Sequence, residues 1–238
     1  MSSGKQMIAL AIIGGVFIAL LVAGIAGNVV RGNYLAFPIA LLVLAFAVSV
    51  IWVSIWFNQR RVQNMFQQAT PDRLIEHYHS SLLRAQARRI PNADAATADL
   101  AALAATVYGQ YDRAREELAK ANWDAAAPMY RARRLDVLAL MALLEDRDGA
   151  AAVGLASEAR ALEAAPTPLR DAVLIAAGEG DAESLKRAQK VAGRVGALAA
   201  VSAWALSLYS ARNGQSEGAE RYQKLANRAA PHFSAAKA

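Results

Sequence analysis

The chain has 238 residues, of which 55% are hydrophobic, and a formal net charge of +6. It has no cysteine, which excludes disulfides, thiol catalysis and Cys-based metal sites. Its charges are interspersed, without the dense basic stripe or interleaved aromatic residues of a nucleic-acid-binding protein. The mean hydropathy of +0.20 is high for a soluble protein, and its cause is local. No acidic residue precedes Asp72, and only Lys5 and Arg31 are charged in the first 59 residues.

Two uncharged segments near the N-terminus are long enough to cross a bilayer. Residues 7–26 form a run of 20, which spans about 30 Å as a helix, and residues 35–57 form a run of 23. Neither run shows an amphipathic period, and a helix that is apolar on all sides belongs in lipid or in a large core. A chain this short has no such core, so residues 1–59 are predicted to form a transmembrane hairpin.

The end of the second run has the residues typical of a membrane boundary. Trp52 and Trp56 precede Arg60 and Arg61, and aromatic rings followed by arginine mark the headgroup level. The loop between the runs carries only Arg31, so the positive-inside rule predicts that both termini are cytoplasmic, in a bacterial inner membrane. If the first run were instead a cleaved signal peptide, the C-terminal part would still be cytoplasmic.

Small residues recur at every fourth position along the first run. They are Ala11, Gly15, Ala19, Ala23 and Gly27. Such a stripe lets another helix approach closely, and it serves either the packing of the hairpin on itself or docking onto a separate membrane protein. Neither run contains an ionisable residue, which argues against a transporter or proton pathway.

The rest of the chain favours helices throughout. Residues 60–91 are predicted to be a juxtamembrane helical connector, with a helix over 72–89 that uses Thr70 as its N-cap and Pro71 as its first residue. In residues 92–238, strong helix formers alternate with Gly and Pro breaks every 10 to 18 residues. This pattern predicts an all-α domain built of helical hairpins in series.

One segment has the spacing of a known helical repeat. It contains Gly109, Tyr111, Ala114, Leu118 and Ala121, and a second copy keeps Gly214, Ala219, Ala226 and Pro231. These residues resemble the turn and second helix of a tetratricopeptide repeat. A weaker copy begins at Gly180, which is 34 residues before Gly214, and a degenerate unit is expected near residues 147–159. A generic α-helical array or bundle remains the alternative.

The resemblance implies a protein-binding groove lined by the first helix of each pair. The candidate groove residues are Asp99, Leu103, Thr106, Trp204 and Leu208. Family members that clamp a C-terminal carboxylate have Lys and Asn at these places, so the mostly apolar residues here favour an amphipathic helix or apolar peptide. Alternatively, Trp204 and Leu208 face the core of the array itself.

Catalytic constellations are sparse. His77 and His79 point about 200° apart on a helix, so they cannot share a metal. Glu116 and Glu117 are expected on a solvated face, and no nucleotide-binding, hydrolase or metalloprotease motif appears. No enzyme activity, cofactor, metal or small-molecule substrate is therefore expected.

The function predicted from these features is that of a membrane-tethered scaffold or assembly factor. Its expected partners are the lipid bilayer and one or more proteins, including another membrane protein, and not nucleic acid. The alternative is an accessory or structural subunit of a multi-subunit membrane complex, which docks through the transmembrane hairpin.

Overall fold

The computed structural model describes residues 44, 48–49, 51–53, 60–61, 64–68, 70–233 and 235. The chain divides into two compact units, Met1–Arg61 and Val62–Ala238. The predicted spans over 7–26 and 35–57 lie almost wholly outside the described residues, as do Trp56 and the five small residues of the stripe. None of the helices in the described part is both long and apolar enough for a membrane crossing.

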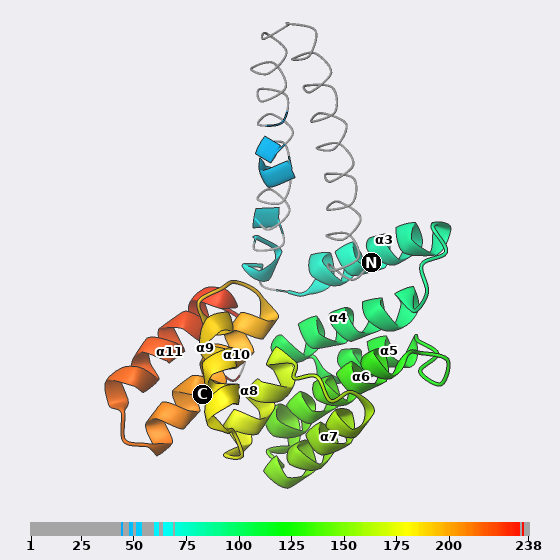
Figure 1. Ribbon diagram of the computed structural model, residues 1–238. Helices are drawn as coiled ribbons and strands as arrows, with labels where there is room; N and C mark the ends of the chain where they lie inside the picture. Colours follow the sequence, from blue (N-terminus) through cyan, green and yellow to red (C-terminus); the bar gives the residue numbers. More distant parts are fainter. Residues whose placement is uncertain are drawn as a thin grey trace, which may run out of the picture. The chain divides into compact units, whose positions relative to one another are not determined.

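The described part of the second unit is entirely helical, without a strand, which confirms the predicted all-α class for that part. A first helix, α3 (Asp72–Ala87), precedes four successive pairs. The pairs are α4 (Ala93–Val107) with α5 (Tyr111–Ala119), α6 (Pro128–Met141) with α7 (Gly149–Leu162), α8 (Pro168–Ala177) with α9 (Ala182–Ala192), and α10 (Ala197–Arg212) with α11 (Ser216–Ala229). A short π-helix, η1 (Ala142–Asp146), extends α6. The two members of each pair are in contact (Figure 1).

The turns within the pairs lie close to the predicted breaks. Gly109 and Gly214 adopt φ values of 73° and 70°, which favour glycine, and the second helix begins two residues after each of them. The third turn differs from the prediction, because the left-handed glycine is Gly178, with φ 97°, and not Gly180. Gly180 is needed for a different reason: a Cβ there would lie 2.5 Å from Cγ1 of Ile175.

Helix α3 begins differently from the sequence prediction. Pro71 occupies the N-cap position in place of Thr70, and no side chain caps the first turn. The helix was expected to be a connector, yet it packs on α4 with Leu74 and Ile75 buried. The segment before it is also anchored, since the hydroxyl of Tyr108 donates to the carbonyl of Phe66 at 3.1 Å. The second unit therefore includes the whole of α3.

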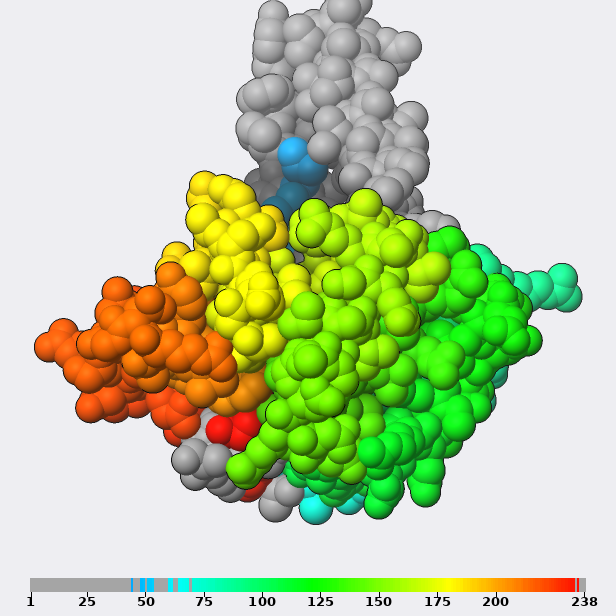
Figure 2. All heavy atoms as spheres, turned by 90° about the horizontal axis from the view of Figure 1, so that it is seen from below, coloured from blue at the N-terminus to red at the C-terminus, as the bar shows by residue number. Residues whose placement is uncertain are grey.

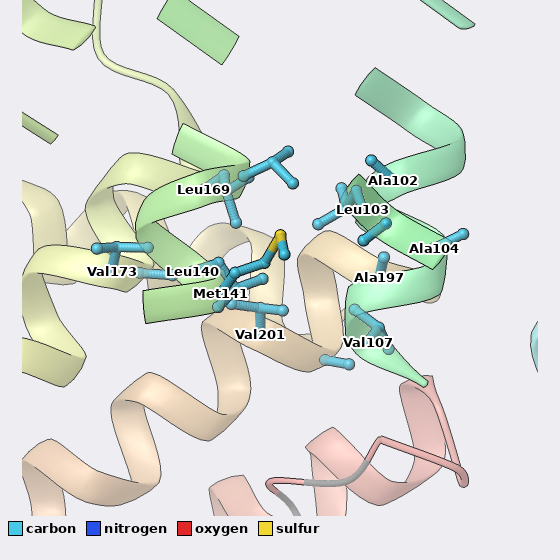
Figure 3. Close-up of a cluster of buried hydrophobic side chains, with 14 of the residues drawn as sticks. Ala102, Leu103, Ala104, Val107, Leu140, Met141, Leu169, Val173, Ala197 and Val201 are labelled. Carbon is cyan, nitrogen blue, oxygen red and sulfur yellow. The ribbon is translucent and has the colours of Figure 1, made fainter. Parts of the chain in front are cut away.

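The first helices of the four pairs form a closed ring around the core. Helix α4 contacts α6, α6 contacts α8, α8 contacts α10, and α10 contacts α4. Their side chains converge in Figure 3, where Leu103 of α4, Met141 of α6, Leu169 of α8 and Val201 of α10 face one another. In Figure 2 the pairs follow one another around the body from green through yellow to orange. An open groove along these helices was expected, but their own side chains fill most of it.

Two glycines provide a matched test of this packing. Gly180→Ala should destabilise the second unit by about 1–3 kcal/mol, because the added Cβ would also lie 2.9 Å from the backbone Cα of Ile175. Gly154→Ala, in the middle of α7, meets nothing within 4 Å and should stabilise by about 0.5–1 kcal/mol. Thermal unfolding followed by far-UV circular dichroism measures both. Equal shifts in the same direction would contradict the close contact at Gly180.

Candidate functional site

A cavity of about 490 Å³ opens at one end of the ring of first helices. Its volume lies within the range of ordinary ligand pockets. Most of its wall is apolar, contributed by Phe66, Leu100, Leu103, Pro166, Pro168, Leu169, Val195, Ala197 and Leu198. Val195 and Leu198 are 41% and 37% exposed, so the rim offers apolar surface to solvent. The polar lining consists of Tyr78, Asp99, Arg133, Asp136 and Thr167.

Asp136 forms a fully satisfied buried ion pair on one side of this cavity. Arg170 donates from Nε to Oδ1 at 2.9 Å and from Nη2 to Oδ2 at 3.3 Å. Thr167 caps the start of α8 and donates from its hydroxyl to Oδ2 at 2.8 Å. Burial raises the pKa of Asp136, and the hydrogen bonds from Arg170 and Thr167 oppose that shift. This pair closes the joint between α6 and α8.

Asp99 is buried with much poorer compensation. It is only 2% exposed, and its charged partner is Arg133 of the neighbouring helix. Nη2 of Arg133 contacts Oδ2 of Asp99 directly, and this hydrogen bond and the charge of Arg133 both favour the ionised carboxylate. Burial raises the pKa of Asp99 to about 6, against the attraction of Arg133 and with the repulsion of Asp136. Tyr78 also faces this charge: burial, and then Asp99, raise its pKa to about 12.

The two ion pairs share a spacing that the sequence reasoning missed. Asp136 and Arg170 are 34 residues apart, and so are Asp99 and Arg133. Each interval joins neighbouring first helices, α4 to α6 and α6 to α8, so each acidic residue meets the arginine of the next pair. An acidic residue followed by arginine at that interval was the signal that could have identified Arg133, Asp136 and Arg170 as site residues.

The predicted groove residues do not all meet at this cavity. Asp99 and Leu103 line it. Thr106 does not, because it is fully buried and its hydroxyl donates to the carbonyl of Ala102 at 2.8 Å. Trp204 is also buried, with its ring edge-on to Phe233 at 5.8 Å between centroids, and Leu208 packs half-buried against the core. For these two residues the structure matches the alternative that they face the core.

The predicted repeat residues mostly occupy the contact between paired helices. Ala114, Leu118 and Ala226 are buried, while Tyr111, Ala121, Ala219 and Pro231 are half-buried, and Gly109 and Gly214 form the turns. A fully buried Ala114 fits a close approach of α5 to α4.

The solvated position predicted for Glu117 is wrong. Its side chain is 4% exposed and lies 2.6 Å from Nζ of Lys120 and 2.9 Å from Nε2 of His79. Because His79 lies on α3, the carboxylate ties α3 to α5. Adjacent acidic residues diverge on a helix, so Glu116 can remain exposed while Glu117 turns inward.

Chemically, the cavity can bury an apolar group and present a carboxylate, a guanidinium and a phenol to its polar end. Within the part of the chain that the structure describes, no group of three or more His, Asp or Glu side chains is placed to hold a metal ion. Comparisons with protein-family models, curated proteins and solved structures find no match to this chain.

The raised pKa of Asp99 gives a pH test. Its folded value of about 6 exceeds the usual 3.8, so its contribution to stability is full below 3.8 and is lost as the pH rises through 6. Asp99→Asn cannot ionise and avoids this loss. We expect the variant to be more stable than the natural chain by roughly 3 kcal/mol above pH 7, with a smaller difference below pH 5.

Unfolding measured across this pH range, with the exposed Asp124→Asn as control, tests the expectation. A difference between Asp99→Asn and the natural chain that does not change with pH would contradict it.

Proposed function

We propose that the chain is a membrane-tethered scaffold or assembly factor that holds a partner protein by an apolar segment inserted into the cavity. The observation that carries the proposal is an apolar rim above a buried, weakly compensated carboxylate. An apolar cavity with a few converging polar groups of perturbed pKa is typical of a binding site. The proposal includes no catalytic step and no cofactor.

The apolar rim of the cavity and the buried carboxylate of Asp99 would contribute differently to partner binding. Val195 and Leu198 would lose their water-exposed surface on binding. Burial of apolar surface strengthens binding but does not fix the orientation of the partner. A donor on the partner that reaches Asp99 would add a hydrogen bond to a buried carboxylate whose charged partner is Arg133. The partner segment is therefore expected to be apolar with a hydrogen-bond donor at its buried end.

Three features of the second unit support the proposal that it is built of repeats. The helices follow one another as pairs, and the second helices begin at Tyr111, Gly149, Ala182 and Ser216, at intervals of 38, 33 and 34 residues. The ion pairs at a spacing of 34 residues support the same period, which is that of a tetratricopeptide repeat. We infer a tetratricopeptide-like array whose first helices have curled into a ring.

The membrane tether is proposed from the charge-free runs in residues 1–59. It is supported by the few helical residues of the second run that the structure describes. Ile51, Trp52 and Val53 are 41%, 71% and 49% exposed, and large apolar side chains exposed in succession favour a lipid environment. The basic flank at Arg60 and Arg61 supports a cytoplasmic position for the second unit, in a bacterial inner membrane.

Substituting the rim tests the partner-binding function. Leu198→Asp should abolish co-purification of the partner from mild detergent, because a charge would enter the apolar contact. Leu162→Asp is the matched control, since Leu162 is equally exposed at 37% but does not line the cavity. Quantitative mass spectrometry of proteins retained by the natural chain and both variants gives the readout. Retention of the same partner by Leu198→Asp would reject the cavity as its binding site.

The alternative, an accessory subunit docked through its hairpin, is favoured by the small-residue stripe. Gly15→Leu with Ala19→Leu should then dissociate the complex during native electrophoresis, because the bulkier side chains prevent close helix approach. Under the cavity-binding proposal the same double variant keeps its partner, while Leu198→Asp loses it. The two functions are therefore separated by which substitution breaks the complex.

A further inference from the structure

The C-terminal end of α3 carries arginines without acidic partners. Arg84, Arg88 and Arg89 are exposed, and none of them forms an ion pair with any described residue. Arg84 donates instead to the carbonyl of Ser80 and the hydroxyl of Ser81. The sequence from His77 to Ala93 contains no acidic residue, so nothing in this segment offsets the three positive charges.

An exposed leucine directly precedes the first of these arginines in sequence. Leu83 is 68% exposed, and no large hydrophobic side chain described in the second unit is more exposed. The opposite side of α3 is firmly packed, with Leu74, Ile75 and Ala85 buried. The helix is thus held in place by the body of the unit while it presents one apolar side chain and three cations to the outside.

We propose that this end of α3 docks onto the surface of an anionic bilayer. Arginine binds phosphate oxygens through paired N–H donors, and an exposed leucine beside basic residues can enter the headgroup region. An acidic protein surface would pair with the arginines but would not favour burial of Leu83. An exposed leucine next to three arginines therefore favours an anionic lipid surface as the binding partner. The surface consists of Leu83, Arg84, Arg88 and Arg89, and we refer to it as the α3 basic end.

This inference rests on the proposed tether, because the hairpin keeps the second unit near the membrane. Ten residues separate Arg61 from Asp72, and a segment of that length extends no further than about 35 Å. At that range a weak surface interaction becomes effectively intramolecular. Each basic residue near an anionic surface contributes modestly, and three together favour the docked state by roughly 100-fold.

The absence of cysteine allows a clean spectroscopic test on the full chain. Leu83→Cys is labelled with an environment-sensitive nitrobenzoxadiazole dye and reconstituted into vesicles of phosphatidylcholine alone or mixed with phosphatidylglycerol. We expect a blue-shifted emission only in the mixed vesicles, reversed by high salt. A label at Leu162→Cys should report water in both. Adding Arg84→Gln, Arg88→Gln and Arg89→Gln should abolish the shift at position 83, whereas three Arg→Lys changes should preserve it.

The outcomes separate the docking from the tether. Emission typical of water at position 83 in mixed vesicles would overturn the docking. A blue shift that does not depend on lipid charge or salt would also overturn it, because it would indicate contact with protein or neutral lipid. Extraction with alkaline carbonate measures the tether separately. Release of the chain by carbonate would reject the hairpin even if the dye reported docking, and retention with an unshifted dye would reject only the docking.

Discussion

Close packing through alanine is the constraint on which the rest of the second unit depends. Helices α4 and α10 are buried on nearly all sides, and most of their residues are alanine or serine. Small side chains let helix axes approach closely, which allows four first helices to surround one narrow core. Larger residues such as Leu103, Leu140 and Met141 fill that core (Figure 3). The cavity lies at one end of this ring, where the entry to α8 and the start of α10 form part of its wall.

Most of the helices could be predicted from local sequence signals, but the long-range contact that closes the ring could not. Glycine at a left-handed turn is a local signal, so Gly109 and Gly214 were identified correctly. Two glycines close together were ambiguous: Gly178 takes the left-handed conformation as the C-cap of α8, while Gly180 packs closely against Ile175. Thr106 was assigned to a groove on the assumption of an open array. Contact between α4 and α10 closes the array, and no periodicity within either helix encodes that contact.

The buried ion pairs show why the two sides of the cavity differ. Asp136 has a bidentate arginine and a threonine hydroxyl, so the attraction and hydrogen bonds offset much of its desolvation. Asp99 has one arginine, whose side chain is 35% exposed. The first arrangement stabilises the joint between helices. The second holds a carboxylate in an environment that disfavours its charge, because burial raises the pKa of Asp99 to about 6.

The segment that precedes α4 forms part of the wall of the cavity and is not only a connector. Phe66 and Tyr78 line the cavity, and Tyr78 faces the charge of Asp99. Contacts of Asp72 with Arg113 and of His79 with Glu117 fix α3 on α5. Phe66 follows Arg61, the last residue of the first unit, by only five residues. The cavity is therefore built in part from the segment that directly follows the first unit in sequence, and buried contacts hold that segment against α4 and α5.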